Sequence, residues 1–521
     1  MNHKPIYIGK SKVHFENKEA KGAFVNIDKE LYYKIEDSDT LRPFFMSIVS
    51  DSNHWLFISS NGGLSAGRKN SDSALFPYYT DDKIMESAEI TGSKAILQIH
   101  RNNKTFLWEP FSNKYEGVYS IHRNLYKNSF GNSVIFEETN VDLGLTFRYQ
   151  WNSSHRFGFV RKAALINNSK KRISLTVLDG IQNILPNGLG ADLQNTRSNL
   201  ADAYKKNELA ALVGLGIYSL SAIIVDKAEP SEALKATIAW SIGLENPNHL
   251  ISSLQLNNFR KGQAISLETA VRAEKGAYFV SAQIDLKADS EKTWLIVADV
   301  DQGPADVVEI AEKLKSPKIL LQEVIDDIEL GTQNLIRLVA AADGLQLTNN
   351  PLQDTRHFSN VLFNIMRGGI FDDNYQIPAA DFVHYIQNAN KRVYQQNQNL
   401  LALLVGSFSL QELRKITAQS TDSDFKRLCF EYLPLKFSRR HGDPSRPWNK
   451  FSINVSNKLD SSRVLNYEGN WRDIFQNWEA LALSYPEFID SMIHKFLNAS
   501  TFDGYNPYRV TKDGFDWEVI D

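Results

Sequence analysis

Leu145-Thr146-Phe147-Arg148-Tyr149-Gln150-Trp151 is the stretch that best indicates the fold of the first half of the chain. It is rich in aromatic and β-branched residues, the types that favour strands. Similar runs follow one another up to about residue 300, and turns such as Asn61-Gly62-Gly63 separate them; the runs include 55–59, 133–136, 174–178, 278–284 and 293–298. Many short strands in one stretch predict a sandwich of antiparallel sheets over residues 1–302.

Two segments inside this β region need separate interpretation. One helix is predicted to interrupt the strands near residues 191–206. The mostly apolar run 209–225 contains glycines and serines, and its length of about 17 residues is at the lower limit for a membrane span. Its strand-forming residues favour a pair of core strands, so no membrane span is expected.

The pattern changes to a helical one at Gly303-Pro304. Residues 305–342 carry apolar side chains at helical spacing, and Pro317 is predicted to divide them into a short and a longer helix. We therefore expect a helical linker over 303–350. Helical periodicity then continues through 351–521, with helices predicted at 355–367, 379–398, 400–404, 410–417, 423–432, 471–483 and 486–497. The predicted fold class is a β then α multidomain protein: an antiparallel β-sandwich, a helical linker and the first part of an (α/α) toroid, truncated at the end of the chain.

Composition excludes several classes of function. The formal net charge of −3 gives no signal for binding nucleic acid. The single cysteine, Cys429, rules out a disulfide within the chain, and Met1 to Tyr7 lack the apolar core of a signal peptide. The histidines are scattered without a metal-ligand spacing. We expect a cytoplasmic protein with no metal, no cofactor, no membrane and no nucleic-acid partner.

The strongest functional signal lies in residues 466–481, which combine rings, carboxamides and charges. A sugar ring offers apolar faces for stacking and hydroxyls that both donate and accept hydrogen bonds, and this mixture of side chains suits it. The candidate sugar-binding residues here are Trp471, Arg472, Asp473, Gln476 and Asn477. The alternative is an ordinary helix N-terminus that is capped by Asn470 or Asp473 and held by a few salt bridges.

Two further loops are candidate binding segments. Arg439, Arg440, His441 and Arg446 lie in a loop rich in proline and glycine and are candidates for holding an anion such as phosphate. The alternative is a structural loop pinned by pairing of arginines with Asp443. Residues 503–509 and 513–518 repeat the mixture of aromatic and polar residues, and there Tyr505 and Arg509 are candidates for a sugar subsite. The alternative for these residues is a surface loop.

The order of parts, together with Trp471-Arg472-Asp473-Ile474-Phe475-Gln476-Asn477, resembles the cellobiose phosphorylase family of inverting glycoside phosphorylases. Larger bacterial relatives that act on β-glucan oligosaccharides are most similar around 438–448. The resemblance implies that Asp473 holds hydroxyls of the sugar in the −1 subsite, with Arg472 beside it. Relatives often carry an additional Arg a few residues upstream, where this chain has Tyr467-Glu468. Because of this difference, the resemblance leaves the substrate subtype open.

The resemblance also implies a mechanism. A carboxylic acid protonates the glycosidic oxygen while inorganic phosphate, the co-substrate, attacks the anomeric carbon from the opposite face and inverts it. The family's general acid is expected beyond Asp521, so the catalytic residue is unknown here and the chain by itself is expected to be inactive. The resemblance further implies an oligosaccharide substrate, and a homodimer is the expected assembly because such enzymes are often dimers.

Two other functions stay open at this point. One is an inverting glycoside hydrolase on the same scaffold, such as a debranching-type glucosidase, which uses water and a second carboxylate. The other is a non-catalytic protein that binds glycans through the sandwich. Phosphate dependence of sugar release separates the first from a phosphorylase, and a toroid completed downstream would distinguish an enzyme from the second.

Overall fold

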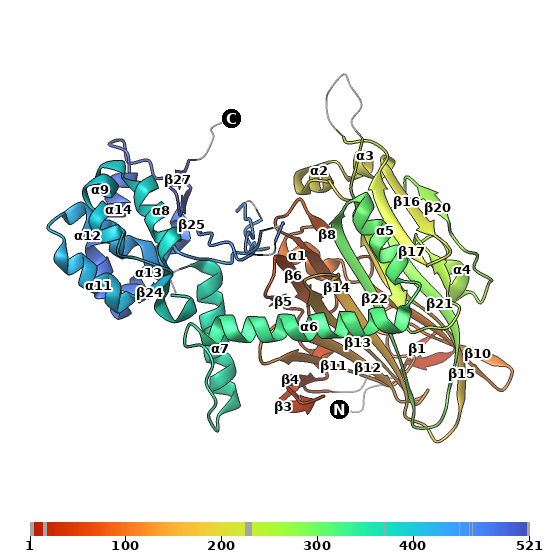
Figure 1. Cartoon of the computed structure of the whole chain (residues 1–521). Coiled ribbons are helices and arrows are strands. Elements are labelled where there is room, and N and C mark those ends of the chain that lie inside the picture. The colour runs from red at the N-terminus through yellow and green to blue at the C-terminus, as the bar shows by residue number, and fades with distance from the viewer. Residues whose placement is uncertain are drawn as a thin grey trace. The chain divides into compact units, whose positions relative to one another are not determined.

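The computed structural model describes residues 5–13, 18–224, 232–368, 371–447, 449–457, 459–460 and 462–517. Contacts divide the chain into two compact units. The β unit comprises residues 1–332 with 442–451, and the helical unit comprises residues 333–441 with 452–521. Figure 1 shows strands in the first and mainly helices in the second. The prediction of a β-rich N-terminal part followed by a helical C-terminal part is confirmed. The closure of the helices into a toroid and the domain limits at 302 and 350 stay predictions.

Two large antiparallel sheets dominate the β unit. Within the described residues, the larger sheet has eleven strands in the order β20 (Ala270–Arg272), β16 (Lys205–Ala210), β17 (Leu215–Leu220), β18 (Ala236–Ile242), β22 (Glu291–Gln302), β14 (Gly158–Asn167), β13 (Leu145–Ser154), β12 (Val134–Asn140), β11 (Ile121–Asn128), β4 (Glu30–Glu36) and β3 (Lys21–Ile27). The other sheet is ordered β10 (Lys104–Trp108), β9 (Gly92–Arg101), β15 (Ile173–Ile184), β21 (Gly276–Leu286) and β19 (Asn248–Leu250).

Smaller elements complete this unit. A four-stranded sheet has the order β5 (Phe45–Ile48), β6 (His54–Ser59), β7 (Leu64–Arg68) and β8 (Ala74–Phe76), and β1 (Ile6–Ile8) pairs with β2 (Ser11–Val13). The short helices are η1 (Ser38–Thr40), α1 (Asp81–Glu86), α2 (Ala191–Thr196), α3 (Ser198–Ala203) and α4 (Leu256–Arg260).

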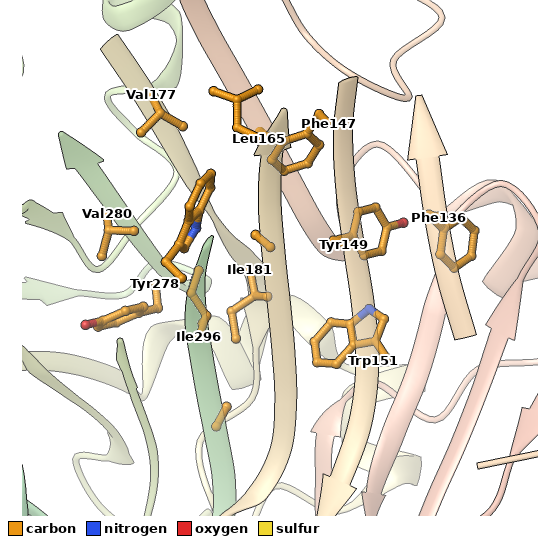
Figure 2. Packing of buried hydrophobic residues seen from close by; sticks show 14 of the residues in the cluster. Phe136, Phe147, Tyr149, Trp151, Leu165, Val177, Ile181, Tyr278, Val280 and Ile296 are labelled. Atoms are coloured by element: carbon orange, nitrogen blue, oxygen red, sulfur yellow. The ribbon is translucent and has the colours of Figure 1, made fainter. Parts of the chain in front are cut away.

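The main core of the β unit lies between the two large sheets. On β13, Leu145, Phe147, Tyr149 and Trp151 are all buried and point to one face, because alternate residues of a strand share a face. Figure 2 shows Phe147, Tyr149 and Trp151 of this strand in the same cluster as Ile181 of β15 and Tyr278 of β21. The stretch that predicted strands from composition therefore supplies much of the core between the sheets.

A buried ion pair also joins the two sheets. The Arg161 guanidinium on β14 donates two hydrogen bonds, of 2.6 and 2.8 Å, to the Asp179 carboxylate on β15. The Trp294 indole N–H on β22 donates to the same carboxylate at 2.7 Å, and Arg161 Nε donates to Ser93 Oγ at 2.8 Å. Both charged side chains are completely buried. The paired groups satisfy one another, which removes most of the cost of burying each charge alone.

The predicted break at Pro317 is confirmed, since α5 spans Pro304–Lys313 and α6 spans Pro317–Ala340. Ile310 of α5 with Leu320 and Val324 of α6 pack in one cluster with Trp240 and Val297 of the large sheet. Because β13 uses the opposite face of that sheet for the main core, the helices cover its second face.

Two other predictions for the β unit have different outcomes. The strand pair expected in the run 209–225 is confirmed in part: Leu209 and Ala210 end β16 and Leu215–Leu220 form β17, whereas Ile223 and Ile224 lie after β17 outside any strand and Val225 lies outside the described residues. The single helix near 191–206 is wrong in its extent: α2 and α3 are separate short helices that meet at Arg197, and strand β16 already begins at Lys205. Among the described residues, no helix combines the length and apolar character needed to cross a membrane.

The helical unit contains α7 (Pro351–Arg367), η2 (Asp373–Tyr375), α8 (Ala379–Ala389), α9 (Lys391–Gln396), α10 (Gln398–Leu401), α11 (Leu410–Gln419), α12 (Ser423–Tyr432), η3 (Leu433–Leu435), α13 (Trp471–Ser484), η4 (Pro486–Phe488) and α14 (Ile489–Ala499). Its strands are β23 (Gln376–Pro378) with β24 (Ser407–Ser409), and β25 (Glu468–Asn470) with β26 (Arg509–Thr511) and β27 (Phe515–Asp516). The helix predicted over 379–398 is divided at Asn390, whose side chain accepts a capping hydrogen bond from the Val393 N–H at 3.2 Å.

Candidate functional site

A small three-stranded sheet fixes the start of α13, where the predicted sugar-binding residues lie. Strand β25 pairs with β26 so that Asn470 is opposite Arg509, and β26 pairs with β27 so that Arg509 is opposite Asp516. The Trp471 N–H donates to the Tyr508 carbonyl at 3.0 Å. Segments about forty residues apart in the sequence therefore meet at the first turn of this helix.

The same region receives Arg440 from another part of the chain. The Ser438 N–H donates to the Asn466 carbonyl at 2.8 Å, and the Glu468 N–H donates to Ser438 Oγ at 3.0 Å, so the two segments run side by side. Arg440 Nη2 then lies 3.8 Å from Asp473 Oδ2. The two side chains are 14% and 35% exposed, so the carboxylate is neither fully solvated nor enclosed in a dry interior.

Burial affects the charge of Arg440. Loss of solvation lowers the pKa of its guanidinium from the ordinary value, and the nearby negative charge of Asp473 opposes that shift. Glu468 also lies near enough to favour the charged form. An arginine in this setting stays protonated at neutral pH, and any further negative charge or polar oxygen placed beside it stabilises the guanidinium.

Arg509 forms the second charged group of the site. Its Nη1 donates to Glu468 Oε2 at 2.9 Å, and its Nε donates to Asp516 Oδ2 at 2.8 Å. The guanidinium therefore links β25 with β27 and orients both carboxylates. This role was not foreseen: the sequence analysis treated Arg509 as a direct sugar ligand, and its hydrogen bonds to Glu468 and Asp516 hold the small sheet together.

Two buried oxygen atoms beside these groups lack hydrogen-bond partners among the described residues. They are Asn470 Oδ1 and the Tyr508 hydroxyl. Asn470 is the N-cap residue of α13, but its side chain makes no capping hydrogen bond, so the simple capping alternative does not explain it. A buried polar atom without a partner costs about 1–3 kcal/mol, and ligand hydroxyls can supply the missing bonds.

The remaining predicted sugar-binding residues are distributed unevenly. The Trp471 ring packs edge-on against Phe475 and Phe496, with centroids 5.8 and 4.8 Å away. Arg472 is exposed, Asn477 is partly buried, and Tyr505 is 68% exposed. The Gln476 side chain lies outside the described residues.

Trp478, the second indole of residues 466–481, is completely buried in the core of the helical unit. Because Trp471 and Trp478 both pack in that core, their rings help to position α13. The polar groups at its N-terminus are then the ones available to meet hydroxyls.

The four predicted phosphate ligands belong to different units. Arg439, Arg440 and His441 are in the helical unit, and the exposed Arg446 is in the β unit. The Asp443 carboxylate accepts hydrogen bonds from the Ser445 N–H at 3.0 Å and the Ser445 hydroxyl at 2.6 Å. Its pairing with an arginine stays a prediction. The structure brings Arg440 to Asp473.

Sequence reasoning missed Glu468, Asn470, Tyr508 and Asp516 as members of this site. All four lie inside stretches that the sequence analysis singled out for their mixture of rings and polar groups. The signal that was missing is the pairing of β25 with β26, because a three-residue strand has too little periodicity to be recognised.

Residues 371–434 match the family model described as "Glycoside hydrolase family 149 insertion domain 1". The matched segment runs from just before η2 to the middle of η3, so it includes α8 and α12. This match supports a carbohydrate-active protein. A comparison with curated proteins finds no match.

Solved structures give weaker similarities. A putative kojibiose phosphorylase from the human microbiome aligns with a TM-score of 0.32 and 7% identity, over 63% of this chain and 41% of that one. Heparinase III aligns with a TM-score of 0.23 and 12% identity, over 53% and 36%. A putative aldose 1-epimerase from Klebsiella pneumoniae aligns with a TM-score of 0.25 and 7% identity, over 57% and 91%. Scores at this level do not establish a shared fold. The chain thus spans about 41% of the length of the kojibiose phosphorylase structure.

Proposed function

We propose that this chain carries the sugar-holding part of an inverting phosphorylase that cleaves β-linked gluco-oligosaccharides with inorganic phosphate. The observation that carries the proposal is the meeting of Asp473 with Arg440, beside two buried oxygen atoms that have no partner among the described residues. The match of residues 371–434 to an insertion domain of a glycoside hydrolase family supports a carbohydrate ligand.

Each group has a proposed role. Asp473, beside Arg440, accepts hydrogen bonds from two sugar hydroxyls, because a carboxylate offers several acceptor sites. Asn470 and Tyr508 bind further hydroxyls through their buried oxygens. Arg440 holds Asp473 and lends positive charge to the phosphate that attacks the anomeric carbon. We assign no general acid within this chain. The helices of this unit are proposed to form part of an (α/α) toroid.

Calorimetric titration with β-linked gluco-oligosaccharides tests the sugar site. Asp473→Asn keeps the size of the side chain but removes the charge, and hydrogen bonds to charged groups contribute about 1.5–3 kcal/mol. We expect the affinity to fall by about 10- to 100-fold. Asp490→Asn is the matched control, since Asp490 is an exposed carboxylate in the same unit, and its affinity should stay unchanged. Equal affinity of wild type and Asp473→Asn for the oligosaccharides would contradict the proposal.

Phosphate dependence tests the reaction class. A protein that extends this chain with the rest of the catalytic domain is expected to release a sugar 1-phosphate from the oligosaccharide only when phosphate is present. Release of free sugar at the same rate without phosphate would identify an inverting hydrolase instead. Neither result changes the calorimetric test, so sugar binding and phosphorolysis are judged separately.

A further inference from the structure

A second polar cavity lies in the helical unit and shares no residue with the Arg440–Asp473 pair. It has a volume of about 280 Å³ and is lined by α8, α12, α14 and the turn between β26 and β27. Two of these helices, α8 and α12, belong to the segment that matches the insertion domain. The proposed phosphorylase function gives this cavity no role.

Two cations share one carboxylate on its inner wall. Glu431 on α12 is buried and accepts a hydrogen bond from Arg427 Nη1 and one from the Tyr385 hydroxyl at 3.3 Å. Lys495 Nζ on α14 lies 3.7 Å from the second oxygen of Glu431. One negative charge thus stands against two positive charges, so a positive charge is left uncompensated on the wall.

The two cations are poorly solvated. The Lys495 side chain is 11% exposed, and burial lowers the pKa of its amine from the ordinary value. Arg427 Nε is buried and has no hydrogen-bond partner among the described residues. A buried cation is costly unless an anion pairs with it. An anion bound within the cavity would therefore stabilise both charged side chains.

The other ionisable groups that line the cavity do not neutralise the excess positive charge of Arg427 and Lys495. Lys512 Nζ is already paired with Asp381 Oδ1 at 2.5 Å. Asp513 is exposed in the β26–β27 turn. His494 is held by the amide of Asn498 at 3.0 Å. The uncompensated charge between Arg427 and Lys495 thus remains the main electrostatic feature of the inner wall.

The size and the rim of the cavity restrict the ligand further. A volume of about 280 Å³ exceeds what a bare phosphate needs and matches a ligand of monosaccharide size. The amides of Asn388 and Asn498, both exposed, stand at the rim, where they can donate to or accept from hydroxyls. The ring of Phe515 lines the cavity and lies 5.1 Å from Lys495 Nζ, which leaves an aromatic face beside the cation.

We propose that this cavity binds a hydroxylated anion of monosaccharide size, with its phosphate or carboxylate against Arg427 and Lys495 and its hydroxyls at Asn388 and Asn498. The two possible sources of the charge, a phosphoryl group and a carboxylate, share the same chemistry at the cations. The site is separate from the one that holds the oligosaccharide.

Calorimetric titration of the whole chain in phosphate-free buffer tests this inference with glucose 6-phosphate, glucuronate, glucose and inorganic phosphate as probes. We expect at least one anionic sugar to bind, with glucose and inorganic phosphate each at least tenfold weaker. The preferred anionic sugar then distinguishes phosphate from carboxylate as the bound group. Lys495→Met retains the apolar stem and should weaken that binding at least tenfold, and Asn498→Ala at the exposed rim should weaken it severalfold.

Asp473→Asn is the control that separates this cavity from the proposed sugar site, and it should leave binding of the anionic sugar unchanged. Loss of binding in Asp473→Asn would show that the anion occupies the other site and would overturn the inference. Unchanged binding in both Lys495→Met and Asn498→Ala, equal binding of glucose or of inorganic phosphate, or no binding by any anionic sugar would overturn it as well.

Discussion

At the scale of single residues, Asp299 on β22 shows how burial sets the charge of a side chain. It is 3% exposed, and burial raises its pKa from 3.8 to about 6, although the Arg68 guanidinium 3.3 Å away opposes the shift. Between pH 4 and 6 the folded protein therefore holds a proton that the unfolded chain has released. Stability from this group is present at low pH and is lost as pH rises through about 6.

Asp299→Asn should remove this dependence, because the amide stays neutral. The free energy of unfolding of the variant minus that of wild type is therefore expected to increase by about 2–3 kcal/mol when the pH is raised from 4 to 7. Urea unfolding of both proteins at the two pH values measures this change. Asp289→Asn, which changes an exposed carboxylate, is the control and should track wild type. A constant difference between Asp299→Asn and wild type at both pH values would contradict the assignment.

At the scale of elements, the small sheet beside α13 depends on close packing at Gly469. A Cβ at this position of β25 would lie 2.4 Å from Ile474 Cγ2 and 2.7 Å from the Tyr467 hydroxyl. Both neighbours belong to buried side chains, so neither can move aside freely. An added methyl group would push β25 away from the start of α13 and displace Asn470 and Asp473.

Gly469→Ala is therefore expected to destabilise the protein by about 1–3 kcal/mol and to weaken oligosaccharide binding together with stability. Thermal unfolding and calorimetry measure the two effects. Gly514→Ala, in the turn between β26 and β27, provides a matched control, because a Cβ there meets nothing within 4 Å. An Ala at 469 that leaves both properties unchanged would show that β25 does not constrain the site.

The elements also show which local features the sequence can predict. Strand β13 and helix α12 were predicted because each has enough residues for a repeating pattern of burial. The prediction of one helix near 191–206 was wrong in extent, because the helix is interrupted at Arg197 and the last two residues belong to strand β16. Strands β25 to β27 were not foreseen: each has at most three residues, and pairing between distant segments decides them.

At the scale of the whole molecule, the Arg161–Asp179 pair ties the two large sheets of the β unit together. Asp179→Ala would leave the Arg161 guanidinium buried without its counter-charge, so we expect a loss of about 3–5 kcal/mol in unfolding free energy. The double variant Arg161→Met with Asp179→Leu removes both charges and should recover most of that loss. Chemical denaturation of the single and double variants measures the coupling; additive losses in the double variant would contradict it.

The order of a β-rich part and then a helical part was predictable because composition and periodicity change at Gly303-Pro304. The candidate site was predictable only in part. Asp473 and Arg440 were named from their local surroundings, but their meeting depends on segment 438–440 running beside 466–468, which no local pattern encodes. Trp471 was expected to face a sugar, and its partly buried ring also packs against the core of the helical unit.

The central claim is that Asp473 and Arg440 hold a sugar ring at the start of α13. A crystal structure of this chain with a β-linked gluco-oligosaccharide and phosphate tests it most directly. The account predicts a glucosyl unit whose hydroxyls lie within hydrogen-bond distance of the Asp473 carboxylate and of Asn470 Oδ1. A well-ordered oligosaccharide bound elsewhere, with Asp473 contacting only Arg440 and solvent, would contradict it.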